Sequence, residues 1–332
     1  MKIYVPKYYK NFKCIADRCR HSCCIDWEID IDEKTYEKYM ALDTDFGKDL
    51  IGNIESCGED RYFKLSECGR CPNLDERGLC KIILTLGEEY LSDICRLYPR
   101  FFNDVGERRE VGLGLVCEEA VKIILDDCEP FELALEEETS ETSELPEFNP
   151  IPKRDALLAL IGERGKSLSQ KLSAIEDEYL VSVDIHTEKE WLGILSELEI
   201  LDPEWKNILK NSVSGQESDV SRFDVYFERF LTYLIFRHVT QAVSYDNFRA
   251  RVGFVSLSVK LVRYILARES NLTKERIFDI IRLYSSEIEY SEDNTADLIF
   301  EFEAGLAHLG ATENDKKDEK TQKTINEPKI IV

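Results

Sequence analysis

Eleven cysteines carry the clearest chemical signal in this 332-residue sequence, and all of them precede residue 129. Because their number is odd, disulfides alone cannot pair them all. Where thiols stay reduced, such a concentration is typical of a metal-binding or catalytic centre. Thiolates are soft ligands that favour zinc, copper(I) or iron–sulfur clusters over magnesium or calcium. The positions are Cys14, Cys19, Cys23, Cys24, Cys57, Cys68, Cys71, Cys80, Cys95, Cys117 and Cys128.

The spacing of these cysteines predicts metal binding without choosing the metal. Cys68 and Cys71 are spaced like one zinc knuckle, and Cys14 with Cys19 forms a looser one. The remaining order matches neither a standard zinc finger nor a ferredoxin run. Adjacent side chains diverge, so we expect Cys23 and Cys24 to face different centres or only one of them to bind. For the isolated Cys57 and Cys128, we expect a small buried side chain without a ligand role.

The elements expected around the cysteines are short, so most thiols fall in loops or at element ends. Apolar residues alternate with acidic ones over 27–32, which predicts a strand. Asp32 is a suitable N-cap for a helix over 35–42. We also predict strands over 2–5 and 109–116, an irregular segment or short helix over 14–24, and helices over 82–94 and 118–125.

The sequence predicts an α+β protein made of a Cys-rich metal-binding module, 1–128, joined to an α-helical domain, 151–312. Residues 129–149 contain eight Glu and no Lys or Arg, which is typical of a solvated linker, and we assign 129–150 to it. Apolar stripes at helical spacing run through 223–234, 254–265 and 277–284. Thr273 is the expected N-cap of the third of these helices. The polar tail, 313–332, is expected to be disordered.

Charge and hydropathy exclude several classes of function. The chain has 43 Lys and Arg against 66 Asp and Glu, a net charge of −23, which argues against sequence-independent binding of nucleic acid. No apolar run is long enough to span a membrane, and the first residues do not form a secretory signal. We therefore expect a cytoplasmic protein. Residues 222–282 hold 11 Lys and Arg against 6 Asp and Glu, which indicates either a solvated helix face or a docking surface for an acidic partner.

Several segments together resemble the flagellin lysine-N-methylase family. They are YKNFKCIADRCRHSCCIDWEIDID (9–32), GRCPNLDERGLCKI (69–82), LGEEYLSDICRLYPR (86–100), VCEEA (116–120) and, more weakly, FERFLTYLIFRHVTQAV (227–243). The resemblance covers roughly 8–127 and 220–268. As a set the motifs are specific, because so many thiols in fixed local contexts rarely recur by chance.

The resemblance implies an iron–sulfur or zinc centre, S-adenosylmethionine as methyl donor, and lysines of flagellin as substrate. The family pattern places the ligand pool at Cys14, Cys19, Cys23, Cys24, Cys71, Cys80, Cys95 and Cys117. The family is associated with a [4Fe–4S] cluster. Tyr98 and Arg100 follow Cys95 closely, so they are candidates to line the site, with Arg100 pairing a cofactor carboxylate. The alternative is that Tyr98 packs and Arg100 caps a helix end.

Two other functions stay open at the level of sequence. One is a metal-chelating or redox module without methyl transfer, and the other is a zinc-stabilised protein-interaction module. ValGlyLeuGlyLeuVal (111–116) lacks the third glycine and the acidic residue of a dinucleotide-binding motif, so we interpret it as a strand. His238 lies in the phenylalanine-rich helix, where a satisfied core histidine is the commoner role than a ligand.

Overall fold

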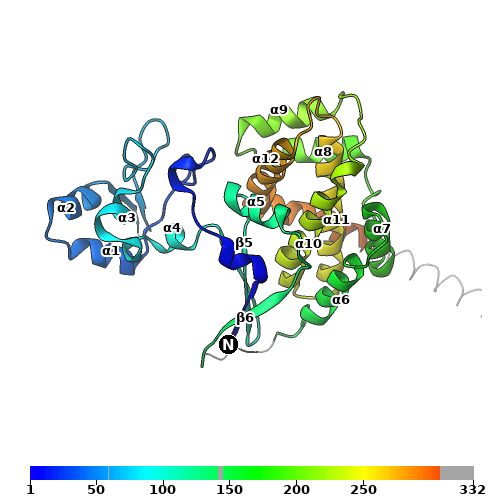
Figure 1. The fold of residues 1–332 in the computed structure, drawn as a ribbon, viewed down its shortest axis with the longest axis horizontal. Helices are drawn as coiled ribbons and strands as arrows, with labels where there is room; N and C mark the ends of the chain where they lie inside the picture. The colour runs from blue at the N-terminus through cyan, green and yellow to red at the C-terminus, as the bar shows by residue number, and fades with distance from the viewer. Residues whose placement is uncertain (59, 141–143, 145, 307–332) are drawn as a thin grey trace, which may run out of the picture. The chain divides into compact units, whose positions relative to one another are not determined.

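The computed structural model describes residues 1–58, 60–140, 144 and 146–306, and it is a mixed α+β protein with a helical C-terminal part (Figure 1). The chain divides into two compact units, each described separately below. The thiol unit comprises Tyr8–Phe101 and Gly112–Ile123. The helical unit comprises Met1–Lys7, Phe102–Val111 and the described residues from Ile124 onward. This division differs from the predicted boundary at residue 128, because the first strand joins the sheet of the helical unit.

One four-stranded sheet has the strand order β4–β5–β1–β6. Strand β1 runs parallel to β5 and antiparallel to β6, and it begins its pairing with Lys2 opposite Arg108 and Glu138. Gly106 adopts a positive φ of 57° between β4 and β5, as a tight turn there requires. The strands are β1 (Lys2–Pro6), β4 (Arg100–Val105), β5 (Arg108–Leu113) and β6 (Leu133–Glu138).

Strand β6 lies inside the segment predicted as an acidic linker, so 133–138 do not form a free linker. The three glutamates at its end, 136–138, are exposed, while its first three residues pair with Val5 and its neighbours on β1. An outer strand of a sheet can carry charge on its open side, which is how this acidic stretch enters a sheet.

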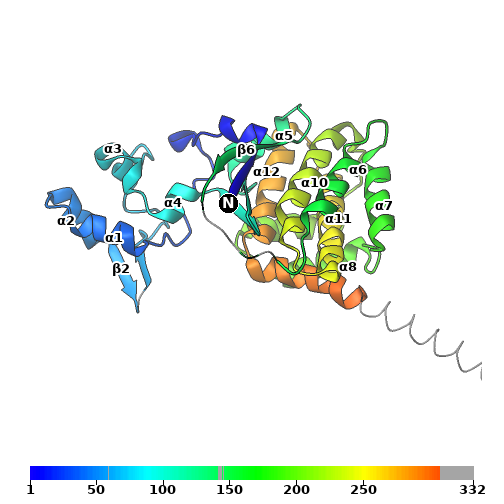
Figure 2. The ribbon, with the colours of Figure 1, turned by 90° about the horizontal axis from the view of Figure 1, so that it is seen from below.

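The helical unit is built around α11, which packs against α7, α8, α9, α10 and α12 (Figures 1 and 2). Residues of α11 from Val252 to Val259 are all buried, so this stretch of the helix is covered on every side, as expected for a central helix. The predicted Thr273 cap is present, with its side chain accepting from Arg276 N–H. The helices are α6 (Ile151–Ile161), α7 (Leu168–Tyr179), α8 (Glu188–Glu197), α9 (Pro203–Ser212), α10 (Asp224–His238), α11 (Tyr245–Leu266) and α12 (Lys274–Tyr284).

The thiol unit has short elements and a small core. Asp32 caps α1 as predicted, by accepting from Thr35 N–H at 2.9 Å. Residues 27–32 alternate in burial but pair with β3 only through the bridge from Asp30 to Tyr62, so they do not form the predicted strand. The elements are α1 (Glu33–Met40), α2 (Asp45–Gly52), β2 (Ile54–Cys57), β3 (Asp60–Phe63), α3 (Lys81–Leu86), α4 (Asp93–Leu97) and the first part of α5 (Glu118–Asp126).

The predicted helix over 82–94 is interrupted. Gly87 adopts a φ of 102° after α3, a short 3₁₀ turn follows over Glu88–Tyr90, and α4 then carries Cys95. The glycine supplies a backbone conformation that other residues rarely adopt, which ends the first helix. The disordered tail predicted over 313–332 and the end of the predicted helical domain, 307–312, lie outside the described residues.

Candidate functional site

Ten of the eleven cysteines lie in the thiol unit, and Cys128 alone belongs to the helical unit. Backbone hydrogen bonds bring three of the ten together. The N–H of Cys71 donates to the carbonyl of Cys24 at 2.9 Å, and Leu74 forms an antiparallel bridge with Cys80. The tight loop between Cys71 and Cys80 therefore returns both cysteines to the segment that carries Cys24.

The core of the thiol unit unites these three cysteines with a fourth. Cys71 is buried within that core, and Cys24, Cys80 and Cys95 pack against it. Cys95 arrives from α4, far from the others in sequence. We call Cys24, Cys71, Cys80 and Cys95 the inner thiol set.

The other four cysteines of the predicted ligand pool gather around the start of α5. The Cys19 thiol lies 3.8 Å from the carboxylate of Glu118, which follows Cys117 directly, and the N–H of Ala16 contacts the Cys14 sulfur at 3.4 Å. Cys23 neighbours Cys24, so the adjacent cysteines join the two groups. We call Cys14, Cys19, Cys23 and Cys117 the outer thiol set.

The protonation of the thiols reflects this grouping. Burial raises the pKa of Cys71 to about 11 and that of Cys95 to about 12, and the thiolate of Cys24 raises both further. Burial also raises the pKa of Cys19 to about 11, with Cys117 and Cys14 adding to the effect. Cys24 differs, because a hydrogen bond from the Cys23 thiol lowers its pKa to about 7. Without metal, the thiols of Cys19, Cys71 and Cys95 therefore hold their protons at neutral pH.

The donor type of each set fits a thiolate-bound metal, since each set supplies four soft ligands within one unit. Zinc binds thiolate sulfur at 2.3 Å, so a tetrahedral zinc ion needs sulfurs about 3.8 Å apart. Among the described residues, no three Cys, His, Asp or Glu side chains lie close enough to share one ion. A polynuclear cluster imposes a wider spacing, because each thiolate binds a different iron atom.

The three cysteines outside the predicted pool are exposed. Cys57 ends β2, and Cys68 shares a contact of 3.2 Å with the hydroxyl of Ser66. The prediction that Cys57 and Cys128 are buried is wrong, because the first ends a surface hairpin and the second follows the end of α5.

Tyr98 and Arg100 both take part in packing contacts within the thiol unit. The Tyr98 ring lies 5.5 Å from that of Trp27. Arg100 donates from Nε to the Tyr9 hydroxyl at 2.7 Å and from Nη1 to the Arg96 carbonyl at 3.3 Å, near the end of α4. These contacts match the structural alternative for both residues, and a catalytic role for either stays a prediction.

An acidic hollow of about 1000 Å³ opens on the thiol unit. Asp32 lines this hollow and connects two helices, because its carboxylate accepts from the N–H of Thr35 in α1 and of Asp93 in α4, both at 2.9 Å. Asp93 and Ile94 of the lining precede Cys95 of the inner thiol set. The lining is Glu28, Asp30, Ile31, Asp32, Glu33, Gly58, Asp60, Arg61, Asp93 and Ile94.

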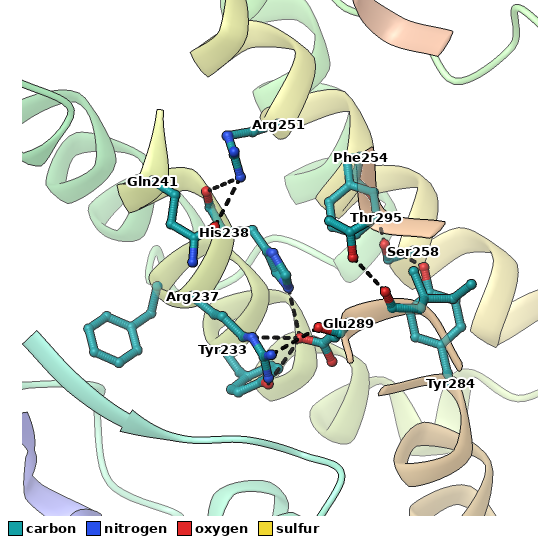
Figure 3. Close-up of polar contacts among 12 residues, drawn as sticks. Tyr233, Arg237, His238, Gln241, Arg251, Phe254, Ser258, Tyr284, Glu289 and Thr295 are labelled. Carbon is teal, nitrogen blue, oxygen red and sulfur yellow. Dashed lines mark hydrogen bonds and ion pairs between the residues drawn. The ribbon is translucent and has the colours of Figure 1, made fainter. Parts of the chain in front are cut away.

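A second polar cluster is buried in the helical unit (Figure 3). Glu289 closes a π-helical turn, Ser285–Glu289, and its Oε2 lies 2.8 Å from His238 Nε2 and accepts from the Tyr233 hydroxyl at 3.0 Å. Arg237 contacts the same oxygen at 3.4 Å. Burial raises the pKa of Glu289, but the charge of Arg237 together with the hydrogen bond and charge of His238 outweighs this, and the pKa falls below its ordinary value. His238 is a core residue as predicted, and its Nε2 is paired with Glu289, but its buried Nδ1 has no hydrogen-bond partner among the described residues, so it is not the fully satisfied histidine that we expected.

The sequence did not point to Glu289, because this residue is placed by a π-helical turn, which no local sequence pattern predicts. Such turns are frequent at functional sites. Here the carboxylate is enclosed by side chains of its own unit, so its observable role is to neutralise Arg237 within the helical core.

Arginines that contribute to the positive charge of 222–282 make their contacts inside the helical unit. Arg249 donates to the Tyr179 carbonyl at 2.8 Å and Arg251 to the His238 carbonyl at 3.1 Å. Arg263 pairs with Asp224 at 3.1 Å, and Arg268 lies 3.4 Å from Glu217. These four arginines therefore do not support the docking-surface interpretation, because they hold helix ends and neighbouring helices of their own unit.

Comparison with known proteins places this thiol-rich chain among flagellar relatives. It is 32% identical over 148 residues to "Flagellar biosynthetic protein FliU" of Salmonella muenchen, covering 41% of this chain and 82% of that protein. The chain belongs to the FliU and lysine-N-methylase family. It is also 33% identical over 147 residues to a protein named "Lysine-N-methylase" in Salmonella choleraesuis and to one in Salmonella typhimurium.

These matches cover 40% of this chain and 34% of each lysine-N-methylase, so the chain aligns with about a third of those relatives. No protein-family profile matches the sequence, and no solved structure matches it. Among the described residues of this family member, no helix is long and apolar enough to cross a membrane.

Proposed function

We propose that this chain is a protein-lysine N-methyltransferase that modifies flagellin and takes its methyl group from S-adenosylmethionine. The observation that carries the proposal is that a member of the FliU and lysine-N-methylase family gathers eight thiols into two sets within one unit. The family name supports the reaction and the flagellar substrate. The thiol sets support a metal centre in the same protein.

The inner thiol set is our candidate for the principal metal centre, with a [4Fe–4S] cluster as the group and zinc as the alternative. Its four sulfurs belong to the core of the thiol unit, where few waters compete for the metal. When bound, such a group supplies positive charge that keeps the surrounding thiols deprotonated. The outer thiol set completes the ligand pool beside Glu118, in more exposed surroundings.

Methyl transfer to lysine needs a neutral amine, because an ammonium has no free electron pair. The lysine nitrogen attacks the methyl carbon, the carbon–sulfur bond of the sulfonium breaks, and neutral S-adenosylhomocysteine leaves. The methylated nitrogen then releases one proton. The main obstacle is the first deprotonation of a group whose ordinary pKa is about 10.4.

The acidic hollow is our candidate for the entry of the substrate lysine. Its lining contains six carboxylates and one guanidinium, that of Arg61, which pairs with Glu33. A cationic side chain is attracted to such a surface during encounter. Asp93 and Ile94 would bring the bound lysine next to the helix that carries Cys95. Carboxylates stabilise the ammonium form, so we assign the hollow to capture and not to deprotonation.

The test is a direct assay with the full chain prepared without oxygen, because the cytoplasm in which we place the reaction keeps thiols reduced. The protein is incubated with S-adenosylmethionine and flagellin, and lysine-containing peptides are examined by mass spectrometry. We expect mass increases equal to whole methyl-for-hydrogen replacements. Unmodified flagellin from a metal-replete preparation would refute the methyltransferase. A broad visible absorption band would support iron–sulfur, whereas colourless protein with stoichiometric zinc would support the alternative metal.

A further inference from the structure

Two buried polar side chains beside the inner thiol set lack hydrogen-bond partners. Asn73 is 1% exposed, and neither its Nδ2 nor its Oδ1 has a partner among the described residues. Ser92 is fully buried, and its hydroxyl likewise has none. Leaving a buried polar group unsatisfied costs folding free energy, so such groups call for a physical reason.

Both residues are held next to a thiol by their own backbone. Asn73 lies two residues after Cys71, and its carbonyl accepts from Lys81 N–H at 2.7 Å, next to Cys80. Ser92 precedes α4, and its carbonyl accepts from Arg96 N–H at 2.9 Å, one residue after Cys95. The sequence and these bonds hold the backbone of each residue next to a cysteine of the inner thiol set.

Ser92 occupies an N-cap position without capping its helix. A serine there normally accepts a hydrogen bond from the first turn. The side chain of Ser92 makes no such bond, and the N–H of Asp93 instead donates to Asp32 at 2.9 Å. Since Asp32 serves the helix end, the hydroxyl of Ser92 is available for another acceptor.

Cys71 and Cys95 are the members of the inner thiol set that neighbour these donors along the chain. Ser92 precedes the short helix α4 that carries Cys95, and its buried hydroxyl has no partner among the described residues. Asn73 follows Cys71 by two residues, and its buried amide likewise has no partner among the described residues. A neutral thiol is a weak acceptor, while a metal-bound thiolate is a strong one.

We propose that Asn73 and Ser92 are positioning residues that donate hydrogen bonds to the metal-bound thiolates of Cys71 and Cys95. The assignment rests on the proposed inner metal centre. Donors of this kind orient thiolates, and in iron–sulfur proteins they set the reduction potential. Their loss typically weakens metal binding by about 10- to 100-fold.

The experiment compares Ser92→Ala and Asn73→Leu with the unchanged chain and with Ser66→Ala. The last variant is the matched control, because it removes a serine hydroxyl beside Cys68, a thiol outside the predicted pool. Each full-length protein is reconstituted without oxygen with ferrous iron and sulfide, and separately with zinc. Metal retained against increasing chelator is then measured by elemental analysis, together with the visible spectrum.

We expect Ser92→Ala and Asn73→Leu to lose metal at about 10- to 100-fold lower chelator concentration, with a shifted sulfur-to-metal absorption band. Ser66→Ala should match the unchanged protein, and Ser92→Thr, which keeps the hydroxyl, should restore retention. Equal retention and identical spectra in both variants would overturn the assignment while leaving the metal centre intact. Failure of the unchanged protein to hold either metal would refute the centre itself. A variant that is merely unstable is recognised by a lowered unfolding midpoint with an unaltered band.

Discussion

Replacing Glu110 by Gln should destabilise the helical unit strongly, because it leaves a buried guanidinium without its counter-charge. Arg154 and Glu110 are both fully buried, and the guanidinium donates to both carboxylate oxygens at 2.8 Å. The pair links β5 to α6. Arg154 Nη1 also donates to Thr240 at 2.8 Å, so the same guanidinium holds the 3₁₀ turn that follows α10.

The magnitude follows from which contacts remain. Removing one partner of a buried pair costs about 3–5 kcal/mol, since the other charge stays buried. Arg154 retains Asp155 at 2.8 Å, although that carboxylate is 53% exposed and is a weaker partner. We therefore expect a loss near 3 kcal/mol, a large share of the 5–15 kcal/mol that is about the usual domain stability. Replacing both residues, as Glu110→Leu with Arg154→Met, should cost less than either single change.

Urea denaturation followed by tryptophan fluorescence measures this loss, because Trp191 and Trp205 are buried in the helical unit. The matched control is Glu163→Gln, which removes the partner of Lys166 in an exposed pair and should change stability little. An unchanged midpoint for Glu110→Gln would refute the reasoning. So would a double variant whose loss equals the sum of the two single losses.

Three further outcomes are expected. Cys71→Ser and Cys19→Ser should lower bound metal measured by elemental analysis, whereas Cys57→Ser should leave it nearly intact, and equal losses would contradict the predicted pool. Chelator should expose the thiol unit to protease before the helical unit, because metal binding contributes to folding, and unchanged cleavage before residue 124 would count against it. The folded state lowers the pKa of both Glu289 and His238, so the unfolded chain binds more protons than the folded one. Urea midpoints should therefore fall as the pH drops below about 6.5, and again below about 4.3. In His238→Asn the first of these two decreases should shrink, and an unaltered decrease would show that another group causes it.

Local signals in the sequence were sufficient for the parts of the fold that depend on near neighbours. The stripes that predict helices over 223–234, 254–265 and 277–284 are confirmed by α10, α11 and α12, because an apolar face and a capping residue act within one or two turns. The Asp32 and Thr273 caps are confirmed for the same reason.

The features that sequence reasoning missed depend on distant partners. Strand β6 is acidic in composition, and only its pairing with β1, some 130 residues earlier in the chain, makes it a strand. Glu289 matters through Arg237 and His238 on another helix. The adjacency of Cys23 and Cys24 suggested that their side chains face different centres. Only the hydrogen bond from Cys71 to Cys24 in the folded chain shows which cysteines accompany Cys24.

The small core of the thiol unit explains why the thiol sets matter to the fold of that unit. Its main hydrophobic cluster has seven buried residues, one of which is Cys71, and the fourteen residues that pack against it, three of them thiols, are only partly buried. A core of this size supplies little of the free energy that folding requires. Metal binding by the inner thiol set would supply the remainder, since the ligands meet only in the folded chain. Under the proposed function, the centre that serves the chemistry is therefore also the centre on which the fold of that unit depends.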